Sequence, residues 1–438
     1  MNEILFFGSN ENPRLLLNKS EKITKPIQFK FENENEKQIK QILSGIYSTI
    51  FLFKNGKAIE YLRNPNQQNP EKIQIEENIQ KVSVGSGNEA ILTKEGNVFA
   101  KGIDINPKNS KEFINISSLI EDTNDRIIQD IAYGYQSIYL LTSNQNAYGI
   151  GSNKYGQLSL SSKIIIKKHK NLNRKTRKSE KPILMMKNVS KIFSGSYSNF
   201  VFLLNSNQEL FVCGNNRFGS LGLGFRKKQI RKLTKIQNIP KGEIIDIQCG
   251  NNYSIMLIEN ENEDENLKRK LYSCGNHRFN GLGKNENTYE FTEIKSSLFE
   301  NDDNILEISI GYYHTLILTS NTKQMIGFGL NLFGQLGTGD TKRQSIPIQI
   351  ELPELRFNED IYNYHVSCGN YKSFLYYSPP SFSNLEEDLI KIFRRKEFCD
   401  ISFKTKNGEI IEAHKLILKY RLNQNQNQNE KLQEIISK

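Results

Sequence analysis

The sequence contains no tryptophan, and it has only five cysteines and five histidines among its 438 residues. No stretch approaches the roughly 18 consecutive apolar residues that a membrane-spanning helix requires, so we expect no membrane span. The N-terminal MNEILFFGSNENPR lacks the basic region and apolar core of a secretory signal. An odd number of cysteines without a C-x-x-C pair indicates reduced thiols and no zinc site. We therefore predict a cytoplasmic protein.

The chain also lacks a recognisable catalytic constellation. His314, in GYYHTLIL, is the most suggestive histidine, but it occupies a position that recurs through the chain. Recurrence favours a turn or strand-pairing role over catalysis. The equivalent residues are Ser48, Asn88, Ser137, Ser198, Tyr253 and Lys372. Cys213 and Cys274 likewise share one recurring position, which is typical of small buried residues. We expect no catalytic residue, no metal site and no cofactor.

Positive charge is concentrated in two short segments. Lys and Arg number 59 against 48 acidic residues, which gives +11. Residues 163–181 hold nine Lys/Arg and one Glu (+8), and residues 225–235 hold six Lys/Arg and no acid (+6). The remainder of the chain therefore sums to −3. The candidate binding cations are Lys167, Lys168, Lys170, Arg174, Lys175, Arg177, Lys178, Arg226, Lys227, Lys228, Arg231 and Lys232.

A glycine-rich motif recurs, which we call the second-half motif. Its clear copies are GSNKYGQLSL (151–160), GNNRFGSLGLG (214–224), GNHRFNGLG (275–283) and GLNLFGQLGTGD (329–340), with a fainter GSNENPRL (8–15). Each clear copy begins with glycine, has an aromatic residue four positions later and leucine seven positions later. The glycines that open the clear copies are Gly151, Gly214, Gly275 and Gly329.

Between these copies lies a more regular first-half motif. It is centred on Gly45, Gly85, Gly134, Gly195, Gly250, Gly311 and Gly369. A β-branched residue precedes each glycine by three positions, and apolar residues follow at five and seven positions. Spacing of two is the signature of a strand. Repeats of 40 to 61 residues with several short strands predict a propeller or a solenoid.

The glycines have two interpretations, a phosphate-binding loop or a tight corner. A phosphate loop is expected once, between a strand and a helix, whereas these glycines recur in strand-like surroundings. We therefore favour the corner, where two backbones approach closely.

The chain starts with a second-half motif, and the repeats end with the first-half motif VSCGNYKSFLYYS (366–378). Joining these halves would complete a blade and remove two unpaired strand edges. Seven first-half motifs then predict a seven-bladed, all-β propeller over residues 1–378.

The repeats resemble the regulator-of-chromosome-condensation repeat. The segments that carry the resemblance are GSNKYGQL, GLNLFGQLGTGD and SIGYYHTLILTS. The resemblance implies a seven-bladed propeller over residues 1–378. That family usually has tryptophan before the second-half glycine. Here the position holds Phe7, Lys101, Ile150, Cys213, Cys274 and Phe328.

After residue 378 the pattern changes. Residues 379–398 are predicted to be a linker with an amphipathic helix over 384–396. Residues 399–421 are predicted to form strand, Asn407-Gly408 turn, strand and helix, an α+β pattern. Residues 399–438 resemble the start of a BTB domain through Asp400, His414 and Lys415. Because a BTB domain has about 100 residues, we expect this segment to be truncated.

Each basic segment follows a second-half motif, so both should form loops on one face of adjacent blades. These loops could bind nucleic acid, chromatin, acidic lipid or an acidic protein surface, or they could simply be solvated. The first also resembles a nuclear-import cluster, which makes the nucleus the alternative location.

Three functions follow. The first is a non-enzymatic scaffold, in which the propeller binds a protein partner; the BTB resemblance implies a link to a cullin ubiquitin ligase or a BTB dimer partner. The second, implied by the propeller family, is guanine-nucleotide exchange on a Ran-like small GTPase. The third is chromatin or nucleic-acid binding through the basic loops.

Overall fold

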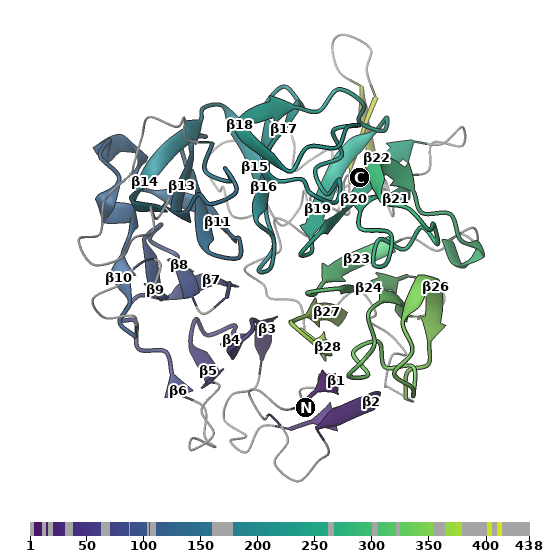
Figure 1. Ribbon diagram of the computed structural model, residues 1–438. Coiled ribbons are helices and arrows are strands. Elements are labelled where there is room, and N and C mark those ends of the chain that lie inside the picture. The colour runs from purple at the N-terminus through teal and green to yellow at the C-terminus, as the bar shows by residue number, and fades with distance from the viewer. Residues whose placement is uncertain are drawn as a thin grey trace, which may run out of the picture. The chain divides into compact units, whose positions relative to one another are not determined.

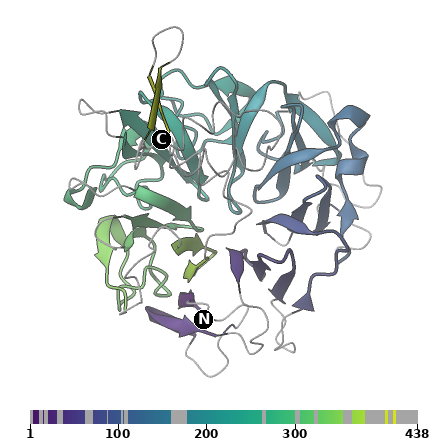
Figure 2. The same ribbon diagram turned by 180° about the vertical axis from the view of Figure 1, so that it is seen from behind.

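The structure is a computed structural model, and it describes residues 4–10, 15, 21–30, 38–62, 71–86, 88–102, 105, 111–159, 178–261, 267–299, 305–320, 325–353, 364–378, 401–404 and 410–413. The chain divides into two compact units, residues 1–260 with 268–378, and residues 261–267 with 379–438. In the first unit, seven four-stranded sheets surround a common axis, as Figure 1 shows from one side and Figure 2 from the other. The predicted seven-bladed, all-β propeller is therefore confirmed.

Six blades are each built from four consecutive strands. Blade 1 contains β3 (Ile39–Ser44), β4 (Ser48–Phe53), β5 (Ala58–Leu62) and β6 (Glu71–Lys72); blade 2 contains β7 (Ile79–Val84), β8 (Asn88–Thr93), β9 (Val98–Gly102) and β10 (Ile114–Asn115); blade 3 contains β11 (Ile128–Tyr133), β12 (Ser137–Thr142), β13 (Ala147–Ser152) and β14 (Lys178–Met186). Blade 4 contains β15 (Val189–Phe193), β16 (Phe200–Asn205), β17 (Leu210–Asn215) and β18 (Gln229–Lys235); blade 5 contains β19 (Glu243–Cys249), β20 (Tyr253–Glu261), β21 (Leu267–Gly275) and β22 (Thr288–Glu293); blade 6 contains β23 (Ile305–Ile310), β24 (His314–Thr319), β25 (Met325–Gly329) and β26 (Gln344–Ile350).

The seventh blade, here the closing blade, combines the two ends of the repeat region. Its strand order is β2 (Lys22–Phe29), β1 (Ile4–Ser9), β28 (Lys372–Tyr377) and β27 (Tyr364–Cys368). Within the described ranges, three short 3-10 helices lie between strands: η1 (Ser117–Leu119), η2 (Thr123–Asp125) and η3 (Ser297–Phe299).

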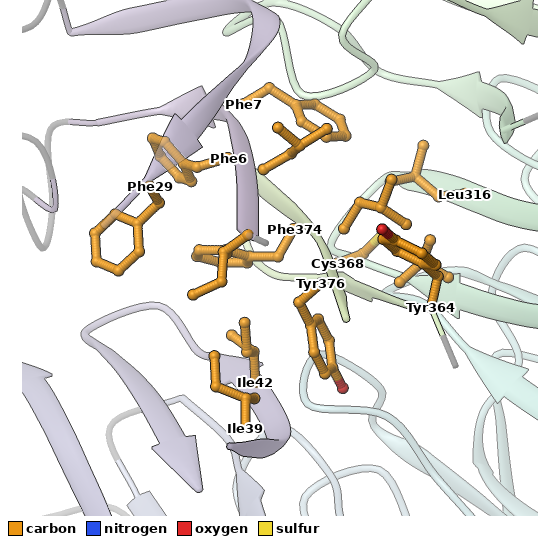
Figure 3. Close-up of a cluster of buried hydrophobic side chains, with 14 of the residues drawn as sticks. Phe6, Phe7, Phe29, Ile39, Ile42, Leu316, Tyr364, Cys368, Phe374 and Tyr376 are labelled. Atoms are coloured by element: carbon orange, nitrogen blue, oxygen red, sulfur yellow. The ribbon is translucent and has the colours of Figure 1, made fainter. Parts of the chain in front are cut away.

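Closure depends on antiparallel pairing of β1 with β28, in a register that runs from Ile4 opposite Tyr376 to Gly8 opposite Lys372. The ring centroids of Phe6 and Phe374 lie 5.3 Å apart across this pair. Figure 3 shows these rings beside Phe29 and close to Ile39 and Ile42 of blade 1. Pairing of the two half-blades is stabilised by this shared core, because separating them would expose its aromatic surface to water.

The second strand of a typical blade is buried along its whole length. Every residue of β4, β8, β12, β16 and β24 is buried. In a propeller, both faces of such a strand pack against neighbouring blades, so both sets of alternating side chains need to be apolar or hydrogen-bonded. This explains the apolar residues at five and seven positions after each first-half glycine.

In the second unit, the structure describes a two-stranded antiparallel hairpin. β29 (Ile401–Lys404) pairs with β30 (Ile410–Ala413), with Ile401 opposite Ala413. The predicted helix over 384–396, the Asn407-Gly408 turn, and Asp400, His414 and Lys415 lie outside the described residues. The BTB resemblance therefore stays a prediction. Among the described residues, no helix has the length and apolar character needed to cross a membrane.

Candidate interaction face

The turns between the first and second strands of the blades gather around the propeller axis. We call them the axial turns: residues 45–47, 85–86, 134–136, 195–199, 250–252, 311–313 and 369–371. Each opens with a first-half glycine. In most of them the glycine N–H donates to the carbonyl three residues later, as from Gly134 to Ser137 (2.7 Å) and from Gly369 to Lys372 (2.8 Å). The motif therefore encodes one hydrogen-bonded turn per blade.

Neighbouring axial turns touch through their backbones. The Tyr135 N–H donates to the Ser198 carbonyl at 2.7 Å, and the Tyr312 N–H donates to the Gly369 carbonyl at 3.1 Å. A Cβ atom on Gly195 would lie only 1.8 Å from the carbonyl oxygen of Cys249 in the next blade. We infer that the turns need glycine because a side chain would push adjacent blades apart.

The loops after the third strands open on the same face of the ring as the axial turns. The Leu330 N–H donates to the Tyr313 carbonyl at 2.8 Å, which joins the loop of blade 6 to the axial turn of that blade. Gly329 enters this loop at φ +106°, where L-residues are disfavoured, and a Cβ atom there would meet the Tyr313 carbonyl oxygen at 2.3 Å. We call the side with both loop sets the motif face.

The glycine-rich loop over 329–340 binds its own chain. Asn331 accepts from the Leu336 N–H at 2.9 Å, and the Gly339 N–H donates to the Thr24 carbonyl in β2 at 2.8 Å. Gly334 and Gly337 donate their N–H groups to carbonyls within the loop. A phosphate cradle needs free amides, so this loop is a joint between blade 6 and the closing blade.

The charge of the motif face is arranged as a neutral centre and a charged rim, in which cations outnumber the exposed carboxylates Glu286 and Glu290 of blade 5. None of the axial turns contains a charged residue. The second-half loops of blades 3, 4 and 5 each place an exposed cation at the same motif position: Lys154, Arg217 and Arg278. Lys154 lies over the Tyr155 ring at 5.5 Å, and Arg217 lies over the Phe218 ring at 5.6 Å. These contacts hold the cations at the surface.

Blade 4 carries the densest positive charge in the described part of the chain. Its basic cluster consists of the exposed residues Arg226, Lys227, Lys228, Arg231 and Lys232. Residues 225–235 were predicted to form a loop, but β18 begins at Gln229, so Arg231 and Lys232 lie on the outermost strand of the blade. The apolar residues Ile230 and Ile236 are buried in the core of this blade, which explains the strand.

Most of the first basic segment falls outside the described residues: Lys167, Lys168, Lys170, Arg174, Lys175 and Arg177. Its last predicted cation, Lys178, begins strand β14 instead of lying in a loop. The described residue nearest its start is Ser159, whose Oγ accepts from the Leu233 N–H of β18 at 2.8 Å. The chain therefore contacts the strand of the basic cluster immediately before this segment begins.

His314 is a buried bridge between blades. Its Nε2 lies 2.9 Å from Ser373 Oγ of the closing blade. The Ser373 hydroxyl donates to the Gln335 carbonyl at 2.7 Å, so Nε2 is the donor to Ser373. Burial lowers the pKa of His314 to about 3, so the ring is neutral at physiological pH. The expected structural role of this position agrees with the geometry.

A buried charged triad between blades 1 and 2 was not predicted. The ammonium group of Lys101 lies 2.6 Å from Glu60 Oε2 and 3.1 Å from Glu89 Oε2. Ser48 donates to Glu89 Oε1 at 2.8 Å. Burial and the neighbouring Glu89 carboxylate raise the pKa of Glu60 to about 9. Because Glu60 and Lys101 lie 41 residues apart in the sequence, on the third strands of two different blades, their meeting left no local signal.

The four described cysteines, Cys213, Cys249, Cys274 and Cys368, are buried thiols whose pKa values burial raises. Such thiols are poor nucleophiles. Among the described residues, no group of three or more potential metal ligands is close enough to hold an ion.

Comparison with protein-family models identifies the repeats. The model of the regulator of chromosome condensation (RCC1) repeat matches residues 207–257 and 324–376, and a second model of the same repeat matches residues 305–335. The chain therefore carries RCC1 repeats.

Two named proteins illustrate the sequence similarity. The human probable E3 ubiquitin-protein ligase HERC4 is 27% identical over 62% of this chain but only 25% of its own length. The ultraviolet-B receptor UVR8 of Arabidopsis thaliana is 29% identical over 37% of this chain and 33% of its own length. The chain thus spans about a quarter to a third of these relatives.

Solved structures share the fold. Prp20p of Saccharomyces cerevisiae superposes with a TM-score of 0.69 at 17% identity, covering 89% of this chain and 94% of its own. Human WBSCR16 gives a TM-score of 0.67 at 16% identity, covering 87% of this chain and 100% of its own. Similarity at this level of identity establishes the propeller fold and no shared function.

Proposed function

We propose that this propeller of RCC1 repeats is a non-enzymatic scaffold that binds an acidic protein surface on its motif face. The observation that carries the proposal is the basic cluster of blade 4, five exposed cations within residues 226–232 and no acidic residue in that segment. A surface of one charge attracts and orients an oppositely charged partner.

The neutral axial turns favour a folded protein over a nucleic-acid strand. A nucleic acid carries a charge at every phosphate and is bound along a continuous cationic track. On the motif face the positive charge lies at the rim, while the centre consists of Gly, Tyr, Ser, Asn, Gln and one Ile. Such residues form adaptable contacts with protein surfaces. A protein with acidic groups around an uncharged centre would complement this arrangement.

Known functions of similar proteins bear on the proposal. Prp20p is reported to bind Gsp1p and histones, and HERC4 is named as a probable ubiquitin ligase, although this chain covers only a quarter of it. Histones are basic, so the basic cluster does not complement them. A link from residues 399–438 to a cullin or to a second BTB chain rests on the sequence resemblance alone.

The test measures binding of a fluorescein-labelled polyglutamate peptide at low and physiological salt. Reversing three charges of the basic cluster, Arg226→Glu, Lys228→Glu and Lys232→Glu, should weaken binding by about tenfold or more, which corresponds to about 1.4 kcal/mol. The matched control reverses the exposed lysines Lys57, Lys94 and Lys187, which lie in connections on the opposite side of the ring. Equal losses in both variants would contradict a specific site.

Two further ligands separate the alternatives. Single-stranded polythymidine that binds more tightly than polyglutamate, with a steeper salt dependence, would favour nucleic-acid binding. Release of labelled GDP from Gsp1p, accelerated by the wild-type protein, would favour nucleotide exchange.

A further inference from the structure

A continuous row of aromatic rings crosses the motif face from blade 5 to the closing blade. Phe279 stacks on Tyr313 with centroids 4.3 Å apart, Tyr313 contacts Tyr312 at 4.3 Å, and Tyr312 contacts Tyr371 at 5.9 Å. Tyr371 in turn stacks on Phe333 at 4.8 Å. We call these five residues the aromatic platform.

The repeat itself does not require this platform. The aromatic position of the second-half motif is Tyr155 in blade 3 and Phe218 in blade 4, and there each ring lies beside its own cation, Lys154 or Arg217. In blades 5 and 6 the corresponding rings, Phe279 and Phe333, stack instead on a tyrosine of the following axial turn. The axial turns of blades 1, 3 and 4 also contain a tyrosine (Tyr47, Tyr135 and Tyr197). The platform is therefore distinguished by the stacking of Tyr313 and Tyr371 on the second-half rings.

The platform is held rigid from below. Tyr197, which is buried, packs edge-on against Tyr312 at 5.2 Å, and its hydroxyl donates to the Ser44 carbonyl of blade 1 at 2.7 Å. The Asn251 amide donates to the Tyr313 hydroxyl at 2.8 Å. Rings fixed in this way lose little conformational freedom when a ligand covers them, so contact with them contributes efficiently to affinity.

Four of the five platform residues reach solvent in part, whereas Phe279 is buried with 9% of its surface exposed, and cations lie near both ends of the row. Tyr312, Tyr313, Tyr371 and Phe333 are partly exposed. Leu332, next to Phe333, leaves 54% of its surface exposed. Two cations flank the rings: Lys22 lies 5.3 Å over the Phe333 ring, and the exposed Arg278 adjoins Phe279 in sequence. Apolar surface between cations complements a ligand that is apolar in the middle and acidic on both sides.

We propose that the aromatic platform is the anchor site for an acidic peptide segment of the partner, which places one aromatic or large apolar side chain on the rings. The carboxylates of the segment pair with Lys22 and Arg278. This inference rests on the proposed function, because it assigns a recognition site to the same motif face. Tyrosine-rich, rigid and partly desolvated positions are where binding energy concentrates in protein interfaces.

The test compares two fluorescein-labelled polyglutamate peptides that differ in one central residue, Phe or Ser. Wild-type protein should bind the Phe peptide about tenfold more tightly or better, because one buried aromatic side chain contributes about 1.5–3 kcal/mol. Tyr313→Ala and Tyr371→Ala should remove this preference and leave the Ser peptide unaffected. The matched controls, Tyr155→Ala and Tyr47→Ala, truncate aromatics of the same face outside the platform and should keep the preference.

Leu332→Glu tests the site without removing a ring. The side chain is 54% exposed, so the variant should fold normally, as judged by its thermal unfolding. The new carboxylate repels both acidic peptides, and it should weaken binding of the Phe peptide more than binding of the Ser peptide, because only the Phe side chain contacts this position. Equal wild-type affinity for both peptides would overturn the platform while leaving the basic cluster and the proposed function intact. Failure of both peptides to bind would overturn both proposals. A loss in Tyr313→Ala confined to polythymidine would show a base-stacking surface instead and would also overturn the inference.

Discussion

In five blades the side chain before the second-half glycine is apolar and buried, whereas in blade 2 it is a lysine. The apolar set is Phe7, Ile150, Cys213, Cys274 and Phe328, all almost completely buried. Lys101 occupies the corresponding place in β9 and is surrounded by Glu60, Glu89 and Ser48. We call the space that this side chain occupies between two adjacent blades the wedge. It can be filled either by apolar side chains or by a cluster of charges that compensate one another.

The difference shows that this position accepts side chains of very different size, and even a charge, where the surrounding side chains fill the space and compensate that charge. Residue sizes range from Cys213 to Phe328. The triad of blades 1 and 2 instead fills the space with long polar side chains that are held by the ion pairs of Lys101 with Glu60 and Glu89. Such a cluster is stable only while all its members are present, because removing one partner leaves a buried charge uncompensated. An apolar wedge lacks this dependence on its neighbours.

Placing a lysine in an apolar wedge should have the largest effect. In Phe328→Lys the ammonium group would face the apolar core of blades 5 and 6, which contains Ile255, Ile317 and Ile326. Loss of the ring and burial of an unpaired charge should lower the free energy of unfolding by about 5 kcal/mol or more. Urea denaturation measures it. A variant with near-native stability would show that the wedge adapts to charge without partners.

Removing the lysine of blade 2 should have the next largest effect. Lys101→Met keeps the length of the side chain but leaves Glu60 and Glu89 facing each other, and it should cost about 3 kcal/mol of unfolding free energy. Adding Glu60→Gln and Glu89→Gln should recover most of this loss, because no buried charge remains. If the triple variant is less stable than Lys101→Met, the triad is not the source of the effect.

The smallest effect is a pH dependence that only the charged wedge should show. The pKa of Glu60 is raised from 4.5 to about 9, first by burial and then by Glu89. Between these values the folded chain keeps a proton that the unfolded chain releases, so stability falls as pH rises through this window. The slope attributable to Glu60 is up to about 1.4 kcal/mol per pH unit.

Replacing this carboxyl by an amide isolates its contribution. Glu60→Gln cannot titrate, so the difference in unfolding free energy between this variant and wild type should grow in favour of the variant from pH 6 to pH 8. Urea denaturation at each pH measures it. A constant difference across this range would mean that Glu60 is ionised in the folded state.

The features that recur in the sequence were predictable, because the same spacing of glycine and apolar residues in every repeat indicates the same local backbone structure. The strand pattern after Gly45 and its six counterparts identified the blades, and the split motif at the two ends predicted the pairing of β1 with β28. Contacts between residues of two different blades were not predictable, because no repeated pattern in the sequence indicates them. Lys101 and Glu60 are neighbours only because β5 and β9 belong to adjacent blades, and Phe333 meets Tyr371 for the same kind of reason.

The basic segments show a different limit of sequence reasoning. Their charge suggested loops, yet Ile230 alternates with exposed Arg231 at the start of an outer strand, which needs only one buried face. Buried Ile230 within β18, and buried Ile236 directly after it, hold this cationic strand at the edge of the sheet. The motif face itself was not predictable, because the sequence gives no indication of which side the partner uses.

The closing blade also has a consequence for how the molecule is made. During synthesis on the ribosome, β1 and β2 emerge first, but their neighbour β28 is translated only after all six other blades. Until then the hairpin presents an open edge, and the nascent ring has a gap that any matching strand could fill. Two chains synthesised side by side could exchange these hairpins, which would produce an intertwined pair in place of two separate rings.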